Sequence, residues 1–185
     1  MAHLLIPRPA PADYPPYYAP YVEAVPEGDL VRSLEDQCED VLALLRRFGE
    51  ENGGVRYAAG KWSVREVVGH LADAERVFAY RALRFARADA TPLPGFDENA
   101  YVAAAGFDRR TLADLAEEFA DVRCATVKLF CALGAEALAR AGTANGARVT
   151  VGALAWIIAG HERHHARILR ERYEPLVLNN EVRPG

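Results

Sequence analysis

Three histidines fall within five positions near the end of the chain, at His161, His164 and His165. His161 and His165 are four residues apart, so on a helix with about 3.6 residues per turn their side chains project from the same face. Neutral imidazoles arranged in this way can bind one divalent metal ion. The alternative is a pair of core histidines that hydrogen-bond to neighbouring groups, and this segment alone does not decide between the two.

The histidine His164 competes with His165, because a pair three residues apart, His161 and His164, can also share a helical face. Spacing alone does not decide between His164 and His165, and the one that is not a ligand would line the pocket or lie at the edge of the fold. The same segment also matches H-E-x-x-H, the zinc-protease pattern in which the glutamate is the general base. No further histidine follows His165 and no strand is predicted, so we interpret this match as coincidental.

Glu162 remains a candidate catalytic residue, because it could orient His165 or act near a metal ion. It lies about 100° around the helix from His161. We favour the alternative of an exposed glutamate that pairs with a basic neighbour such as Arg163 or Arg167.

A third imidazole comes from a second helix. Ser63 and Glu66 form a capping-box pattern, S-x-x-E, which predicts that a helix begins here. The apolar residues of this helix recur at helical spacing, and His70 lies among them (Val64, Val67, Leu71, Ala74 and Phe78). A single histidine on such a face is commonly structural. Together with His161 and His165, however, it would complete three nitrogen donors with an open fourth position, which is typical of catalytic zinc sites.

Two carboxylates in a long connection, Asp97 and Glu98, are further candidates for a catalytic role. At the rim of a metal pocket, a carboxylate could act as a general base or bind a polar cofactor. The alternative is that these residues cap a short helix that begins near Glu98.

Hydrophobic periodicity predicts four helices and no convincing strand. The first follows Asp29 and runs to Gly53 and Gly54, the second runs from Ser63 to about Asp89, the third is capped by Asp108 and includes Leu112 to Leu133, and the fourth runs from Thr150 to Tyr173. About twenty residues join the second helix to the third, which is more than an antiparallel pair needs. We therefore expect an all-α four-helix bundle in which these two helices can run parallel.

The chain is expected to fold as one bundle domain, residues 29–173, with an arm before it and a tail after it. Residues 1–28 carry seven prolines interleaved with tyrosines, which predicts an extended arm wrapped over the bundle. Residues 174–185 hold two prolines and are expected to be irregular.

Composition excludes several classes of function. The formal net charge of -4, without a basic block, argues against nucleic-acid binding. No apolar run approaches the roughly 20 residues of a membrane-spanning helix. The three cysteines, Cys38, Cys124 and Cys131, form an odd set within predicted helices, which favours small core residues in a reducing cytoplasm over a disulfide framework.

Taken together, Trp62-Ser63-x-x-Glu66-x-x-x-His70-Leu71 and, about ninety residues later, Gly160-His161-x-x-x-His165 resemble the DinB/YfiT-like superfamily of metal-dependent enzymes. The likeness covers residues 29–173. It implies an up-down-down-up bundle, often a homodimer, with a divalent metal, commonly nickel or zinc, bound by His70, His161 and His165.

Such a centre supports two kinds of chemistry on a small-molecule substrate. A metal ion that polarises a carbonyl or activates water would give a hydrolase. An ion that binds a low-molecular-weight thiol as thiolate would give a thiol S-transferase, an activity known in the superfamily that the sequence resembles. The alternative to both is a noncatalytic metal-binding stress or interaction module that dimerises.

Overall fold

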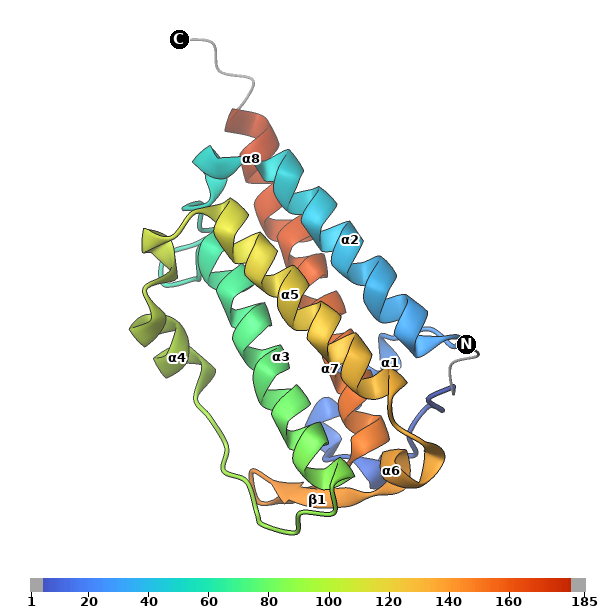
Figure 1. Ribbon diagram of the computed structural model, residues 1–185. Coiled ribbons are helices and arrows are strands. Elements are labelled where there is room, and N and C mark those ends of the chain that lie inside the picture. Colours follow the sequence, from blue (N-terminus) through green and yellow to red (C-terminus); the bar gives the residue numbers. More distant parts are fainter. Residues whose placement is uncertain (1–4, 181–185) are drawn as a thin grey trace.

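Four long helices form the body of the protein in a computed structural model that describes residues 5–180. They are α2 (Leu30–Phe48), α3 (Val64–Ala86), α5 (Leu112–Cys131) and α7 (Val151–Ile168). Helices α2 and α7 run in one direction, and α3 and α5 run in the other (Figure 1). The predicted up-down-down-up bundle is therefore confirmed.

The parallel pair α3 and α5 needs a long return connection, because both helices begin at the same end of the bundle. Residues 87–111 make this return along the outside of the bundle (Figure 1). They include a short helix α4 (Glu98–Ala105) and a 3-10 turn η4 (Phe107–Arg109). The predicted crossover is thus present, and it contains a helix of its own.

Side-chain caps fix where the long helices begin. Asp29, Ser63 and Thr150 cap α2, α3 and α7, and Ser63 forms the predicted capping box with Glu66. The prediction that Asp108 caps the third long helix is wrong, because Thr111 caps α5. Asp108 instead accepts a hydrogen bond of 2.5 Å from the Ser63 hydroxyl, which ties the start of α3 to the connection.

A β-hairpin, which the sequence reading missed, closes one end of the bundle between α6 (Ala135–Ala139) and α7. Its antiparallel strands are β1 (Ala141–Ala144) and β2 (Ala147–Thr150). Asn145 and Gly146 form the turn with φ of 51° and 75°, as a two-residue type I′ turn requires. Leu93 donates its amide to the Thr143 carbonyl at 2.9 Å, so the long connection is attached to the hairpin.

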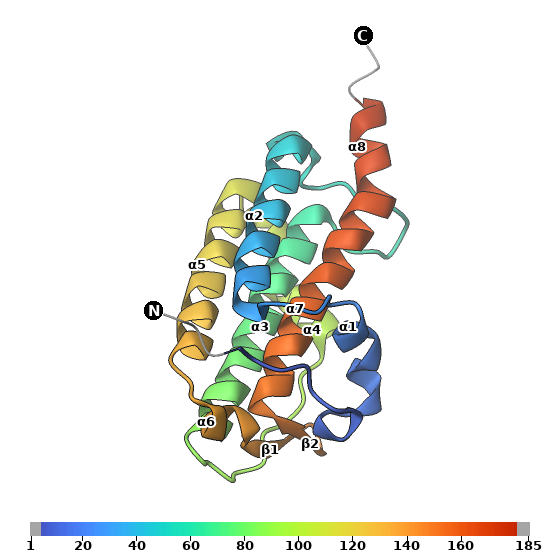
Figure 2. The same cartoon turned by 90° about the vertical axis from the view of Figure 1, so that its right-hand side faces the viewer.

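The described part of the N-terminal arm is only partly extended, which corrects the predicted form. It contains two 3-10 turns and the short helix α1, which crosses α7 (Figure 2); these elements are η1 (Pro11–Asp13), η2 (Pro16–Tyr18) and α1 (Ala19–Glu23). The crossing requires glycine at position 160, because a Cβ there would lie 2.0 Å from the Tyr21 carbonyl oxygen. Tyr14 is buried and Tyr18 and Tyr21 are half-buried, whereas Tyr17 is exposed.

The predicted irregular tail is wrong for residues 174–180, and residues 181–185 lie outside the described part. After α7 the chain continues through a π-helical turn (Leu169–Tyr173) into α8 (Glu174–Asn180). Buried Tyr173 and Val177 hold this extension, and the Tyr173 hydroxyl donates a hydrogen bond of 2.7 Å to the Trp62 carbonyl. Pro175, which has no amide hydrogen to donate to the preceding turn, lies directly after the π-helical turn.

The buried side chains form two clusters, and the candidate ligands lie where the clusters meet. On α3, His70 lies between Val67 of one cluster and Ala74 of the other. Cys38 is buried, but Cys124 and Cys131 are exposed, so the expectation of core cysteines fails for these two. None of the described helices has both the length and the apolarity of a membrane-spanning segment.

Candidate metal centre

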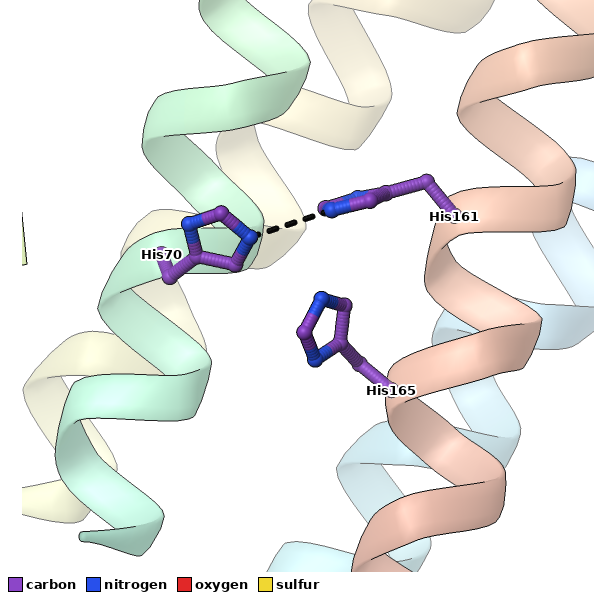
Figure 3. Close-up of side chains that lie close together, drawn as sticks. All are labelled: His70, His161 and His165. Carbon is purple, nitrogen blue, oxygen red and sulfur yellow. Dashed lines mark hydrogen bonds between the residues drawn. The ribbon is translucent and has the colours of Figure 1, made fainter. Parts of the chain in front are cut away.

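The imidazoles of His70, His161 and His165 converge in the bundle interior (Figure 3). His70 projects from α3, and the other two project from successive turns of α7. The Nε2 atoms of His70 and His161 are 3.0 Å apart, and one ring nitrogen from each of the three residues lies within 4.8 Å of the other two. The structure therefore brings together the three histidines that the sequence singled out.

Burial keeps these imidazoles neutral. It lowers the pKa of His70 to about 4, and it lowers the pKa values of His161 and His165 well below the ordinary value. The neighbouring histidines add to this effect, because positive charges on adjacent rings would repel each other. At neutral pH each ring can therefore offer a nitrogen lone pair without first losing a proton.

The donor set fits a divalent transition metal. Imidazole nitrogens bind zinc at about 2.0–2.1 Å, so two of them on one ion lie roughly 3 Å apart, as the Nε2 atoms of His70 and His161 do. Imidazole suits nickel as well as zinc. Three protein ligands would leave at least one coordination position for a reactant.

Aromatic side chains surround the three histidines. The ring centroid of Trp62 is 4.7 Å from that of His70, and the centroids of Tyr21 and Phe78 lie 5.8 Å and 5.9 Å from that of His161. These rings come from the arm, from the loop before α3 and from α3 itself. They limit contact with water, which strengthens electrostatic interactions at the centre.

A cavity of about 410 Å³ opens beside the histidines, within the range of about 300–1,000 Å³ for small-molecule sites. The arm, α3, the long connection, the β-hairpin and α7 all contribute to its wall. Besides the three histidines, its polar wall residues include Arg81, Glu98 and His164. The three imidazoles are thus accessible to a small molecule from one side.

The sequence of the chain matches a known protein family. The sequence profile of the DinB superfamily matches residues 33–169, which span α2 to α7. The chain belongs to the DinB superfamily. A comparison with curated proteins gave no match.

Among solved structures, the fold of this DinB-superfamily protein is similar to that of YfiT from Bacillus subtilis. The TM-score is 0.66 at 18% sequence identity, with 83% of this chain and 91% of the YfiT chain covered. YfiT is described as a probable metal-dependent hydrolase with an unusual four-helix bundle topology. At this identity the likeness shows a shared fold.

In this DinB-superfamily protein, His164 lines the cavity and is not one of the three clustered histidines. It is half-buried, and its ring centroid lies 5.1 Å from that of His165 and 5.5 Å from that of Tyr21. Burial lowers its pKa, and the positive charge of Arg167 lowers it further. His164 is therefore a neutral base in the cavity wall.

Glu162 is neither the exposed glutamate that the sequence favoured nor a partner of His165. Its side chain is only 2% exposed, and its Oε2 atom lies 2.6 Å from Nη1 of Arg123 on α5. This contact is an ion pair without hydrogen-bond geometry. The helical rotation of about 100° per residue turns Glu162 away from the cluster and toward α5. The expected catalytic role and the expected pairing with Arg163 or Arg167 are both corrected.

Arg123 joins two buried carboxylates in one network. Its Nε and Nη2 atoms donate to Glu75 at 2.9 Å and 2.7 Å, and Nη1 donates to the Leu34 carbonyl at 2.6 Å. Burial disfavours the Arg123 charge, but the two carboxylates hold its pKa above the ordinary value. Burial also raises the pKa of Glu162 to about 7, against the opposing effect of Arg123. The network therefore links the four long helices α2, α3, α5 and α7.

The two candidate carboxylates of the connection have separate roles. Asp97 caps α4, accepting hydrogen bonds from the amides of Asn99 and Ala100 at 2.9 Å and 3.1 Å, and it is not part of the cavity wall. The capping alternative thus accounts for Asp97. Glu98 is exposed and lines the cavity, so it stays a candidate for contact with a substrate.

The sequence reading missed two buried arginines, Arg81 and Arg123. Each lies on the inner face of an amphipathic helix, Arg81 three residues after Phe78 and Arg123 four residues after Phe119. A charged residue within an apolar stripe was the signal that could have identified both, because a buried charge needs a partner.

Proposed function

We propose that this protein is a metal-dependent hydrolase of a small molecule, in which His70, His161 and His165 hold a divalent ion, either zinc or nickel. The observation that carries the proposal is the convergence of three neutral, largely buried imidazoles on the wall of a 410 Å³ cavity. A divalent ion held there would supply Lewis acidity, which polarises a carbonyl group and acidifies water. The similarity in fold to YfiT, described as a probable metal-dependent hydrolase, also supports it.

The chain's own groups suit this chemistry. The rings of Trp62, Tyr21 and Phe78 exclude bulk water from the histidines, which favours charge development in a low-dielectric site. Two groups in the cavity wall are of a type that can act as a general base, the imidazole of His164 and the side chain of Glu98. We propose one of them as the general base for the attacking water.

The proposal is tested with protein reconstituted with zinc or with nickel and offered a panel of small-molecule esters and amides. We expect turnover that stops when a chelator is added and that is absent from His161→Ala. Hydrolysis by His161→Ala at the wild-type rate would contradict the proposal.

The same experiment separates the other candidate activities. In a parallel set of reactions, low-molecular-weight thiols are supplied with a generic electrophile. Chelator-sensitive consumption of a thiol without ester or amide turnover would replace the hydrolase with a thiol S-transferase. Metal binding without either reaction would favour a noncatalytic module.

A further inference from the structure

Arg81 is a buried charge in the wall of the cavity that holds the three histidines. Arg81 is only 4% exposed and contributes to the wall of this cavity. It lies on the same helix as His70, three turns further along α3, which corresponds to about 16 Å of helical rise. The cavity therefore has the candidate metal centre in one part and a guanidinium in another.

The contacts of Arg81 leave its charge unmatched. Nη2 donates a hydrogen bond of 2.8 Å to the Pro94 carbonyl, and the guanidinium carbon lies 5.9 Å from the ring centroids of both Phe78 and Phe96. In the described part of the chain, no carboxylate forms an ion pair with it. A guanidinium has five N–H donors, so most of them remain available to a ligand.

The charge of the other buried arginine, Arg123, is neutralised by carboxylates. Arg123 is 2% exposed and contacts the carboxylates of both Glu75 and Glu162. A buried charge is costly without such a partner. Arg81, which is buried to a similar degree but lines a cavity, lacks one, and a negatively charged ligand group would supply it.

We propose that the cavity binds a small, largely apolar carboxylate, with its carboxylate paired to Arg81 and its hydrolysable group at the three histidines. The carboxylate subsite rests on Arg81 alone, whereas the placement of the hydrolysable group rests on the function proposed above. The Arg81 guanidinium carbon and the His161 ring centroid each lie 5.9 Å from the ring centroid of Phe78. They are therefore at most about 12 Å apart, which sets the greatest span between the carboxylate and the hydrolysed bond of the substrate.

The other side chains that line the cavity restrict the class of substrate. Aromatic rings from the arm, the loop before α3, α3 itself and the connection line the cavity, so the middle of the substrate is apolar or aromatic (Tyr17, Tyr18, Tyr21, Trp62, Phe78 and Phe96). One guanidinium matches one carboxylate, which it can bind through two parallel hydrogen bonds. The carboxylate of Glu98 on the same wall disfavours a ligand with several negative charges, such as a phosphate ester.

The position of Tyr18 supports this account of Arg81. Burial raises the pKa of the Tyr18 hydroxyl, and the positive charge of Arg81 opposes that rise. Both side chains also lie beside Phe78, whose ring centroid is 6.1 Å from that of Tyr18 and 5.9 Å from the Arg81 guanidinium carbon. A carboxylate at Arg81 would also be within reach of a neutral hydroxyl donor.

The subsite is tested by calorimetric binding of two probes, 4-phenylbutyrate and its neutral analogue 4-phenylbutanamide, to the zinc-loaded protein. We expect wild type to bind the carboxylate about 10- to 100-fold more tightly than the amide, because a hydrogen bond between charged groups contributes more free energy than one to a neutral group. Arg81→Met should lose this preference, and Arg81→Lys should keep part of it. Arg87→Met removes an exposed charge just after the same helix and should bind like wild type.

Two results would overturn the subsite. One is equal binding of both probes to wild type, which needs no variant and so does not depend on whether Arg81→Met folds. The other is an undiminished carboxylate preference in folded Arg81→Met, which would mean that the probe binds the zinc ion instead. Because binding is measured without turnover, a protein that prefers the carboxylate but hydrolyses nothing would retain the subsite and lose the hydrolase.

Discussion

The Nε2 atoms of His70 and His161 lie 3.0 Å apart although 91 residues separate them in the chain. Replacing His70, His161 or His165 with alanine should each abolish stoichiometric metal binding, because two nitrogens hold an ion much less tightly than three. Elemental analysis of the purified variants measures this directly. His164→Ala is the matched control, since it removes a neighbouring imidazole from outside the cluster, and it should retain the metal. Loss of metal from His164→Ala but not from His165→Ala would reverse the ligand assignment.

Metal binding should also stabilise the fold, because the ligands come from α3 and α7 and are brought together only in the folded state. Free ion at about 100 times its Kd adds roughly 2.7 kcal/mol, which for a chain of this size raises Tm by about 5–10 °C. Thermal unfolding with zinc or nickel and then with excess chelator gives the shift. The Tm of His70→Ala should not respond to either addition, and an equal response would place the ion elsewhere.

Without metal, stability should decrease in mild acid. Burial lowers the pKa of His70 from 6.5 to about 4, so between these pH values the folded state binds fewer protons than the unfolded state. The free energy of unfolding therefore decreases as the pH falls from 6.5 toward 4, by about 3 kcal/mol for this one residue. Denaturant unfolding at pH 7 and pH 4.5 measures the slope, which should be smaller in His70→Asn.

Glu162 changes the free energy of unfolding with pH in the opposite direction to His70. Its folded-state pKa is raised to about 7, so its contribution to stability decreases as the pH rises from 4.5 toward 7. The lowered pKa values of His161, His164 and His165 act in the same direction as that of His70, so wild type shows only the sum of all these effects. The comparison with His70→Asn isolates the contribution of His70. Identical slopes in the two proteins would contradict the assigned protonation of His70.

Loss of the positive charge of Arg123 should lower the free energy of unfolding. Arg123→Met leaves Glu75 and Glu162 buried without a partner, which should cost about 3–5 kcal/mol in the free energy of unfolding. Glu162→Gln should cost far less, because Glu75 keeps both of its hydrogen bonds to Arg123. Urea denaturation distinguishes the two variants. Arg76→Met removes a partly exposed ion pair with Glu118 and should cost no more than about 1 kcal/mol.

The crossing of α1 over α7 gives a further prediction. Replacing a helix-interior glycine with alanine ordinarily stabilises a helix by roughly 0.5–1 kcal/mol. Gly160→Ala should instead lower Tm and expose the arm to proteolysis, because the new methyl group would lie 2.0 Å from the Tyr21 carbonyl oxygen. Gly152→Ala on the same helix is the control, since its nearest atom would be 3.4 Å away. Equal effects of the two substitutions would show that the arm does not pack as described.

Periodicity was enough to predict the four long helices, whereas the choice of His165 over His164 as the third clustered histidine also needed the resemblance to the DinB/YfiT-like superfamily. Apolar residues at helical spacing identify the inner face of α3 and α7, and a histidine on such a face must lie inside. The caps at Ser63 and Thr150 followed from local chemistry, since a side-chain oxygen there satisfies free amides. These features depend on residues within about one helical turn of each other.

Features that depend on distant partners were not predicted. Glu162 is buried because Arg123, 39 positions earlier (162 − 123), lies across from it, and spacing within α7 carries no information about that contact. The continuation of the last helix depends on Tyr173 reaching Trp62. The hairpin was different, because Asn145-Gly146 is a strong local signal for a type I′ turn. It was overlooked because its strands are only four residues long.

The return path that the parallel helices α3 and α5 require also supplies part of the cavity wall, through Gly95, Phe96 and Glu98. The three clustered histidines, in contrast, project from α3 and α7 into the interior of the bundle. Mutations in the return path can therefore alter which molecules enter without disturbing how an ion is held. Under the proposed function, such an arrangement would let one scaffold change its substrates during evolution, and it gives protein engineers a segment to randomise while the three histidines are left intact.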